Sequence, residues 1–467
     1  MKNHFISAAL LVWCNAVFSF KGFEAFLFSD DCPANAPCSC LGPADHALIL
    51  CSNNQLTSVP QFHSSQLHSK ELNIFLNDNK LTTIPNYVFR SLASMNAASI
   101  HLQLDSNMIN YIASNAFDGI ENVITILQLQ NNRLTSVPEA VGNLHSLNYL
   151  DITHNPFKYL GISVMSGIGL SLKTLYIDLS PFPVWPTELI SLRRLEHLTI
   201  SSIPYTAMNS SDFRGFENTL ITLNIEESPR LKKIPCAITR LSQLKSLYLD
   251  YFSQLGANDS SIFENCTQQS RSVSSFTLEH SNMTTFPDVF NFFPSLTSLN
   301  LLGNSLEIIE AEKIPPGNRL AEIDLASNNF KRIPSALNKM KYLSHLDLTN
   351  NDIVSVEDVD LSGLSQLQEL SLSDNPVRYI STHTFDNNKQ LTTLNLANTN
   401  LRILPAAVTS LAHLTDIDFS GVHIMCSCEM SYLKSWNITS ILSFDGVCAN
   451  TQTNLKNYIT ASLKLCP

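Results

Sequence analysis

The chain has 467 residues and a formal net charge of −11 at pH 7, because 40 Asp and Glu outnumber 29 Lys and Arg. No H-E-x-x-H or G-x-S-x-G motif occurs, and the 14 glycines form no phosphate-cradling loop. We therefore expect no enzyme and no cofactor. The alternative is a catalytic site assembled from Asp and His on facing strands, which the absence of motifs does not exclude.

The first residues have the composition of a secretory signal peptide. Lys2 and His4 precede an apolar run over residues 5–20, and residues 17–19 offer a cleavage site. A membrane anchor is the alternative, but the run is short and Asn15 interrupts it. No later run is long or apolar enough to cross a bilayer, and the C-terminal residues lack the hydrophobic tail that directs a lipid anchor. The sequence predicts a signal peptide over residues 1–19 and a secreted, extracellular protein without a membrane span.

Cysteine spacing agrees with an oxidising compartment. One of the eleven cysteines, Cys14, falls within the expected signal peptide, which leaves an even number. Zinc binding by the two C-x-C pairs is the alternative, but the usual C-x₂₋₄-C pairs are missing. We expect disulfides and no metal site, with the terminal cysteines stapling caps over residues 30–72 and 426–467. The cysteines form groups of four, two and four: Cys32, Cys38, Cys40 and Cys51; Cys236 and Cys266; Cys426, Cys428, Cys448 and Cys466.

A leucine-bearing pattern repeats between these caps. The stretch from Leu296 reads L-x-x-L-x-L-x-x-N-x-L, and it returns at Leu320, Leu343, Leu367 and Leu391. The alternation predicts a short strand with apolar side chains on one face, and a single such strand has nothing to bury them against. Stacked copies pair in parallel and share one core. We expect a cap strand at Ile49 and fifteen repeats over residues 73–425, anchored at Ile74, Leu102, Leu127, Leu150, Leu175, Leu198, Leu223, Leu247, Phe276, Leu299, Ile323, Leu346, Leu370, Leu394 and Ile417.

Proline follows the strand in most repeats, as in Ile84-Pro85 and Leu404-Pro405. Because proline lacks an N–H, it disfavours a second regular strand, and we expect short 3₁₀ or irregular segments there. An aromatic residue in the next turn, such as Phe89, is interpreted as core filling and not as part of a cofactor site.

The centre of the array, about residues 175–295, departs from the pattern. Asparagine follows the strand in repeats one to four and ten to thirteen, but the central repeats carry Ser180, Ile203, Ser228, Phe252 and Ser281 instead. The longest repeat, from Leu247 to Phe276, lies in this region. Cys236 and Cys266 occupy adjacent repeats and are close enough in a stacked array for a bridge. N-glycosylation sequons, none on an expected strand, occur at Asn209, Asn258, Asn265, Asn282 and Asn437.

Both cysteine groups at the ends follow recognisable patterns. The segment from Cys426 to Trp436 reads C-x-C-x₄-L-x-x-W, and the N-terminal cysteines read C-x₅-C-x-C-x₁₀-C. With the repeats between them, residues 32–466 resemble extracellular leucine-rich-repeat proteins of the kind found in Slit, Nogo receptor and Toll-like receptor ectodomains. The resemblance implies an α/β solenoid: a leucine-rich-repeat horseshoe with a parallel β-sheet on the concave face and short 3₁₀ or irregular segments on the convex face. It also implies the cap disulfides Cys32–Cys40, Cys38–Cys51, Cys426–Cys448 and Cys428–Cys466.

Residues one before, one after and three after each anchor should point away from the core. These positions contain acids, aromatic residues and histidines, but no Lys or Arg. One explanation is that acids keep an exposed sheet soluble. The other is that a surface of one sign attracts a cationic partner while aromatic side chains add contact area, which disfavours nucleic acid and heparin-like polyanions. The candidate binding residues are Asp151, Tyr176, Asp178, Tyr248, Asp250, Glu322, Asp324, Asp347 and Glu369.

The sequence therefore predicts a secreted protein-binding module whose acidic concave face recognises a protein ligand with a basic surface. A non-catalytic subunit or scaffold of a secreted enzyme complex is the alternative. Asp324 and Asp347 are the strongest candidates, because they occupy the same column of adjacent strands, where like charges repel unless a cation lies over them. The family's ligands vary, and the sequence selects neither a ligand nor an oligomeric state.

Overall fold

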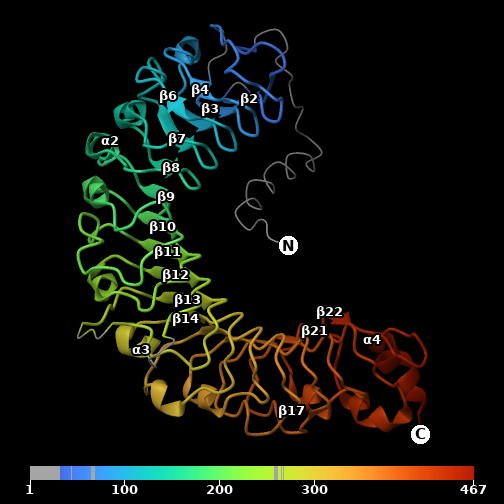
Figure 1. Cartoon of the computed structure of the whole chain (residues 1–467). Coiled ribbons are helices and arrows are strands. Elements are labelled where there is room, and N and C mark those ends of the chain that lie inside the picture. The colour runs from blue at the N-terminus through green and yellow to red at the C-terminus, as the bar shows by residue number, and fades with distance from the viewer. Residues whose placement is uncertain are drawn as a thin grey trace. The chain divides into compact units, whose positions relative to one another are not determined.

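A computed structural model describes residues 32–43, 45–64, 69–256, 261–264, 266 and 268–466. The expected signal peptide and the sequons at Asn258 and Asn265 lie outside these residues. The chain forms two compact units, Met1–Leu172 and Lys173–Pro467. Each unit is a stack of coils in which parallel strands line one face, here called the sheet face (Figure 1).

In the first unit, the strand register follows the leucine alternation. β2 pairs with β3, β3 with β5, β5 with β7 and β7 with β8, all in parallel, whereas β1 is antiparallel to β2. Leu72 and Ile74 of β3 face inward and are fully buried. The strands are β1 (Ser39–Leu41), β2 (His46–Leu50), β3 (Glu71–Phe75), β5 (Ser99–Gln103), β7 (Ile124–Gln128) and β8 (Tyr149–Asp151).

The second unit continues the same arrangement with strands that all pair in parallel. Every anchor expected from the leucine pattern lies on one of the parallel strands of the two units. One strand, β22, was not expected and extends the sheet into the C-terminal cap. The strands are β9 (Thr174–Asp178), β10 (His197–Ser201), β11 (Thr222–Glu226), β12 (Ser246–Asp250), β13 (Ser275–Glu279), β14 (Ser298–Asn300), β15 (Glu322–Asp324), β16 (His345–Asp347), β18 (Glu369–Ser371), β20 (Thr393–Asn395), β21 (Asp416–Asp418) and β22 (Ser443–Asp445).

Buried asparagines hold consecutive coils together. Asn328 donates from Nδ2 to the carbonyl oxygens of Leu301 and Leu325, both at 3.0 Å, and its Oδ1 accepts the N–H of Leu306 at 3.0 Å. Leu301 and Leu306 belong to the preceding repeat, so one side chain joins two coils. Only 5 % of Asn328 is exposed, and these bonds supply partners for buried backbone groups that strand pairing leaves unmatched.

In the central repeats, serine hydroxyls take over part of the hydrogen bonding that asparagine provides elsewhere. Ile203 and Phe252 are buried apolar residues, and their N–H groups donate to Ser228 Oγ and Ser281 Oγ of the following repeats, both at 3.1 Å. The strands β9 to β13 are five residues long, two more than β14. The last residues of three of these longer strands are acids in direct register: Glu226 of β11 pairs with Asp250 of β12, which pairs with Glu279 of β13.

The opposite side of the coils is formed by short helices, several of which begin directly after proline. Proline at this place has the fixed backbone angle that suits a helix start and needs no hydrogen-bond acceptor. The helices are η1 (Arg90–Met95), η2 (Glu139–Asn143), α2 (Ile162–Ile168), η3 (Thr187–Ser191), η4 (Cys236–Arg240), α3 (Val289–Phe292), η5 (Ala311–Lys313), η6 (Ser335–Lys339), η7 (Ala406–Ser410), η8 (Cys428–Ser435), α4 (Leu455–Asn457), the π-helical η9 (Tyr458–Ser462) and η10 (Leu463–Leu465).

Two short strand pairs on this side correct the expectation that no second strand forms. β4 (Thr83–Ile84) pairs with β6 (Tyr111–Ile112), and β17 (Ser355–Val356) pairs with β19 (Tyr379–Ile380). The N–H of Ala113 donates to the carbonyl of Ile84, and that of Ser381 donates to the carbonyl of Val356. The second strand of each pair is followed by Ala113 or Ser381 where other repeats carry proline, so the donor that proline lacks is present.

Disulfides join the same cysteines that the sequence grouped. The N-terminal cap contains Cys32–Cys40 and Cys38–Cys51, and the C-terminal cap contains Cys426–Cys448 and Cys428–Cys466. Cys236 and Cys266 form the fifth bridge, between adjacent repeats of the central region.

Leu348→Ala tests the shared core. Leu348 is fully buried, and its truncation leaves a cavity, so we expect the free energy of unfolding to fall by about 2–5 kcal/mol. Equilibrium urea unfolding followed by circular dichroism measures the change. The exposed Val359→Ala, at 68 % exposure, is the control and should change it by less than about 0.5 kcal/mol.

Candidate functional site

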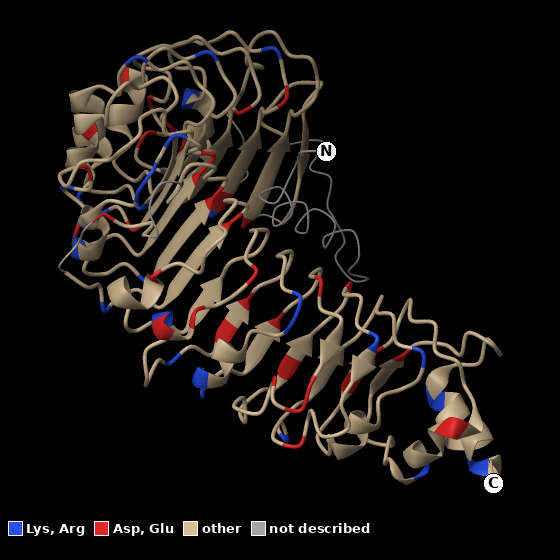
Figure 2. Ribbon diagram, turned by 60° about the horizontal axis from the view of Figure 1, so that its bottom comes forward, with Lys and Arg blue, Asp and Glu red and all other residues tan. Residues whose placement is uncertain are grey.

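The sheet face is acidic in both units. No strand in the described part of the chain contains Lys or Arg, and Figure 2 shows acids on strands as well as elsewhere, whereas the basic residues lie in loops and helices. In the first unit, burial, then Asp78 and to a smaller extent Asp151 raise the pKa of Asp105 to about 6. The acids therefore repel one another where they are partly removed from water.

A groove of about 670 Å³ lies on the sheet face of the second unit, over β14, β15, β16, β18 and β20. Four of the candidate binding residues line it: Glu322, Asp324, Asp347 and Glu369. They form two rows because residues on either side of an inward-facing anchor both point outward. The groove thus gathers acids from three neighbouring strands, and neither Lys nor Arg is among its lining residues.

Asp324 and Asp347 are direct neighbours in the first row, paired across β15 and β16. Asp324 Oδ1 accepts the N–H of Ala326 and Asp347 Oδ1 that of Thr349, both at 2.8 Å, so each carboxylate closes an Asx turn. Burial and, after it, the charge of Asp347 raise the pKa of Asp324. Among the described residues, no donor reaches the second carboxylate oxygen of either aspartate.

The second row alternates acids with a histidine. His345 Nε2 lies 3.4 Å from Glu369 Oε1, and its Nδ1 is 2.8 Å from Ser344 Oγ. The register places His345 between Glu322 and Glu369. Both glutamates are exposed, so this row presents its charges directly to solvent.

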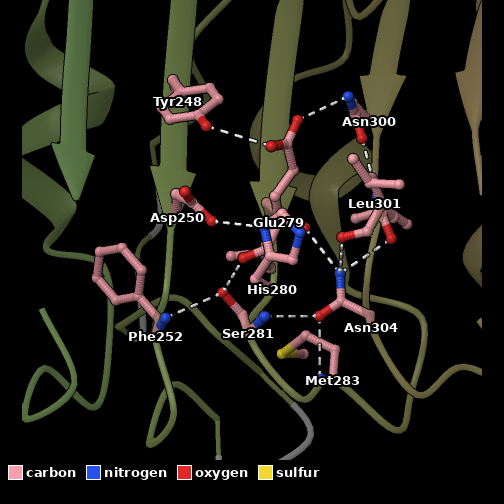
Figure 3. A network of polar contacts seen from close by, with 12 residues as sticks. Tyr248, Asp250, Phe252, Glu279, His280, Ser281, Met283, Asn300, Leu301 and Asn304 are labelled. Carbon is pink, nitrogen blue, oxygen red and sulfur yellow. Dashed lines mark hydrogen bonds and ion pairs between the residues drawn. The ribbon is translucent and has the colours of Figure 1, made fainter. Parts of the chain in front are cut away.

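A second polar cluster lies beside the groove, on β12 and β13 (Figure 3). Tyr248 donates its hydroxyl to Glu279 Oε2 at 3.2 Å, and Asn300 Nδ2 donates to Glu279 Oε1 at 2.8 Å. His280 Nδ1 lies 2.9 Å from Asp250 Oδ1. Burial raises the pKa of both Tyr248 and Glu279, and it keeps the phenol protonated as a donor.

Three candidate binding residues lie outside both groups. Asp151 belongs to the first unit, and its Oδ1 accepts the N–H and hydroxyl of Thr153 at 3.0 and 2.8 Å. Tyr176 and Asp178 lie on β9, where Asp178 is only 8 % exposed and Oδ1 accepts the N–H of Ser180 at 2.7 Å. The structure therefore gathers four candidate residues in the groove and two, Tyr248 and Asp250, in the polar cluster. Asp151, Tyr176 and Asp178 belong to neither group.

His280 was absent from the candidate set because it follows the last outward-facing position of its strand. Its backbone is left-handed, with φ 44°, as are Tyr251 in the preceding repeat and Gly303 in the next. The Tyr251 ring stacks on His280 with centroids 5.0 Å apart. A Cβ on Gly303 would lie 2.6 Å from His280 Cδ2, so the glycine leaves space for the imidazole. A histidine directly after an outward-facing Glu is the signal that could have identified it.

Comparisons with known proteins follow the same repeats. Residues 100–157 and 318–377 match the leucine rich repeat family model. Human leucine-rich repeat-containing protein 3B is 31 % identical over 127 residues, which cover 27 % of this chain and 44 % of that protein. Pig fibromodulin is 38 % identical over 80 residues, or 17 % of this chain and 49 % of that protein. The matched part spans less than half the length of either relative.

Solved structures extend the likeness to most of the chain. Toll, in a Toll–Spatzle complex from Drosophila, superposes with a TM-score of 0.59 over 88 % of this chain and 60 % of that one, at 14 % identity. The chain has the leucine-rich-repeat fold. A leucine-rich-repeat protein of Leptospira interrogans gives a TM-score of 0.52 at 19 % identity, covering 83 % of this chain and 94 % of that one. At these identities the two structures show the fold alone.

The described helices of this chain include none that is both long and apolar enough to cross a membrane.

Asp105→Asn tests whether the acids of the sheet face oppose folding. Because the pKa of Asp105 is raised from 3.8 to about 6 in the folded chain, ionisation favours the unfolded state, and the penalty grows as pH rises through that interval. The variant should unfold with a free energy about 1–2 kcal/mol higher than wild type at pH 7. The difference should vanish near pH 3. Urea unfolding between pH 3 and 7 measures it, with the exposed Glu139→Gln as control.

Proposed function

We propose that this chain is a secreted leucine-rich-repeat module that binds a protein ligand through the groove over β14–β20, and that the groove receives a basic segment of that ligand. The observation that carries this proposal is the Asp324–Asp347 pair. The two carboxylates are neighbours across adjacent strands. Neither forms an ion pair with a Lys, Arg or His in the described part of the chain. A Lys or Arg of the ligand would relieve their repulsion.

Turn formation alone does not account for the charge of this pair. Asn300 and Asn395 lie in the same row and close the same turn, accepting the N–H groups of Leu302 and Ala397 at 2.8 and 3.0 Å. An uncharged amide therefore serves the turn equally well. The two neighbouring negative charges at the middle of the row, where burial raises the pKa of Asp324, need a second explanation, and recognition of a cation supplies one.

Location and assembly fit the same proposal. Five disulfides suit an oxidising compartment, and the apolar N-terminal run would serve as the signal peptide. The sequon residues Asn209, Asn282 and Asn437 are exposed, off the strands, and available to carry glycans. Toll was solved in a complex with Spatzle, and we extend protein binding from that neighbour to this chain.

Asp324→Asn/Asp347→Asn is the test, because Asn keeps the Asx-turn acceptor and removes only the charge. The probe is a fluorescent oligolysine peptide titrated into the glycosylated chain at 0.05 and 0.3 M salt. We expect wild type to bind, the double variant to bind about tenfold more weakly, and both affinities to fall at high salt. Hydrogen exchange should locate the protection on β14–β20.

The matched control is Glu312→Gln/Asp358→Asn, which removes two charges from exposed positions off the sheet face. It should bind as wild type does. Equal affinity of wild type and the groove variant, or protection confined to another surface, would rule out the groove as the recognition site.

A further inference from the structure

The polar cluster beside the groove has a composition that ion pairing with a protein ligand does not require. We propose that Asp250, Glu279 and His280 form a binding site for a divalent transition-metal ion of the zinc class. The proposal is independent of the groove: it concerns different side chains, and it holds whether or not the groove binds a basic ligand.

The ligand atoms are already close together. One imidazole nitrogen and one oxygen from each carboxylate all lie within 4.8 Å of one another. Around a zinc ion, with bonds of about 2.0–2.2 Å, neighbouring ligand atoms are about 3.3 Å apart. Asp250 and Glu279 are paired directly across β12 and β13, so small rotations of their side chains would close the remaining distance.

Surrounding groups orient two of the three ligands, Glu279 and His280. Tyr248 and Asn300 hold one oxygen each of Glu279, which leaves lone pairs on both oxygens. The His280 ring stacks on Tyr251 and lies close against Gly303, and these two contacts hold the plane of the ring. Such outer groups, which orient ligands by hydrogen bonding and packing, are typical of metal sites.

The charge around the cluster is also unbalanced. Glu226 on β11 pairs in register with Asp250, which pairs with Glu279, so three carboxylates lie in one row. Burial and the charge of Asp250 raise the pKa of Glu226. Among the described residues, His280 alone forms an ion pair with these carboxylates, and an imidazolium supplies at most one positive charge. A divalent ion would offset more of the row's charge.

The imidazole decides the class of metal. Calcium and magnesium take oxygen ligands, whereas an imidazole combined with carboxylates suits zinc and its neighbours in the first transition row. Three protein ligands leave a coordination position open for water or for a group of a bound partner.

A simple ion pair between His280 and Asp250 is the competing explanation, and the chain contains its own control. His345 contacts Glu369 at 3.4 Å on the same sheet face, but within the described residues only the Asp250 cluster brings three potential ligands within reach of one ion. If a histidine beside an acid were sufficient, the two places would bind metal equally.

The experiment uses the full glycosylated chain without an affinity tag, stripped of metal with a chelator. Zinc is titrated in competition with a chromophoric chelator, and cobalt(II) replaces it for visible spectroscopy. We expect one zinc ion per chain at this site, cobalt absorption bands of an N/O site, and a zinc affinity at least about 100-fold above that for calcium. His280→Gln should weaken zinc binding at least about 100-fold, and Tyr248→Phe, which removes only the donor to Glu279, about tenfold.

His345→Gln should leave zinc affinity unchanged. Near-ultraviolet circular dichroism of each variant without metal shows that its fold is intact. The proposal is overturned if wild type binds no zinc, if His280→Gln binds it as wild type does, or if His345→Gln loses as much affinity as His280→Gln. Loss of oligolysine binding by the groove variant with zinc binding retained would confirm that the two sites are separate.

Discussion

The hydrogen bonds of the buried asparagines are the constraint on which the repeats depend. A strand of three residues can pair only briefly with its neighbours, and the chain must turn away from the sheet at the same place in each coil. The Asn328 amide nitrogen lies within hydrogen-bond distance of three carbonyl oxygens, and its Oδ1 accepts one backbone N–H, so the side chain joins two coils. Because the turn is fixed in this way, the inward positions become a continuous leucine core and the outward positions form regular rows.

The sheet face differs between the central and the later repeats of the second unit. In the central repeats serine or an apolar residue replaces asparagine, and the strands are two residues longer than β14, a length that β3, β5 and β7 also have beside their asparagines. That extension carries Glu226, Asp250 and Glu279 into direct register. In the later repeats, by contrast, aspartates end the strands early, and Asp324 and Asp347 meet one row nearer the anchors. The two acidic groups of the second unit therefore lie at different distances from the anchors, on strands of different length.

Much of this could be predicted from the sequence, because period-2 alternation fixes which residues face the core and the repeat spacing fixes which strands are neighbours. For this reason the pairing of Asp324 with Asp347 followed from column positions alone. The position of His280 did not, because the alternation of inward and outward residues stops at Glu279 and the imidazole reaches the sheet face through a left-handed turn after it. The short strands β4, β6, β17 and β19 were missed because the proline rule was applied to repeats in which Ala113 and Ser381 provide the N–H.

The residue before the asparagine position has a left-handed backbone in many repeats, and its side chain varies widely. Residues as different as Asp78, Asn131, Glu227, Tyr251, His280 and Gly303 occupy this place in different repeats. A position that accepts acids, amides, aromatic rings and glycine alike imposes no chemistry of its own beyond a modest conformational cost. Substitution there can change the edge of the sheet face in one coil at a time. The adjacent buried residue still forms the hydrogen bonds that join consecutive coils. A leucine-rich-repeat chain can therefore acquire a new binding specificity without passing through an unstable intermediate.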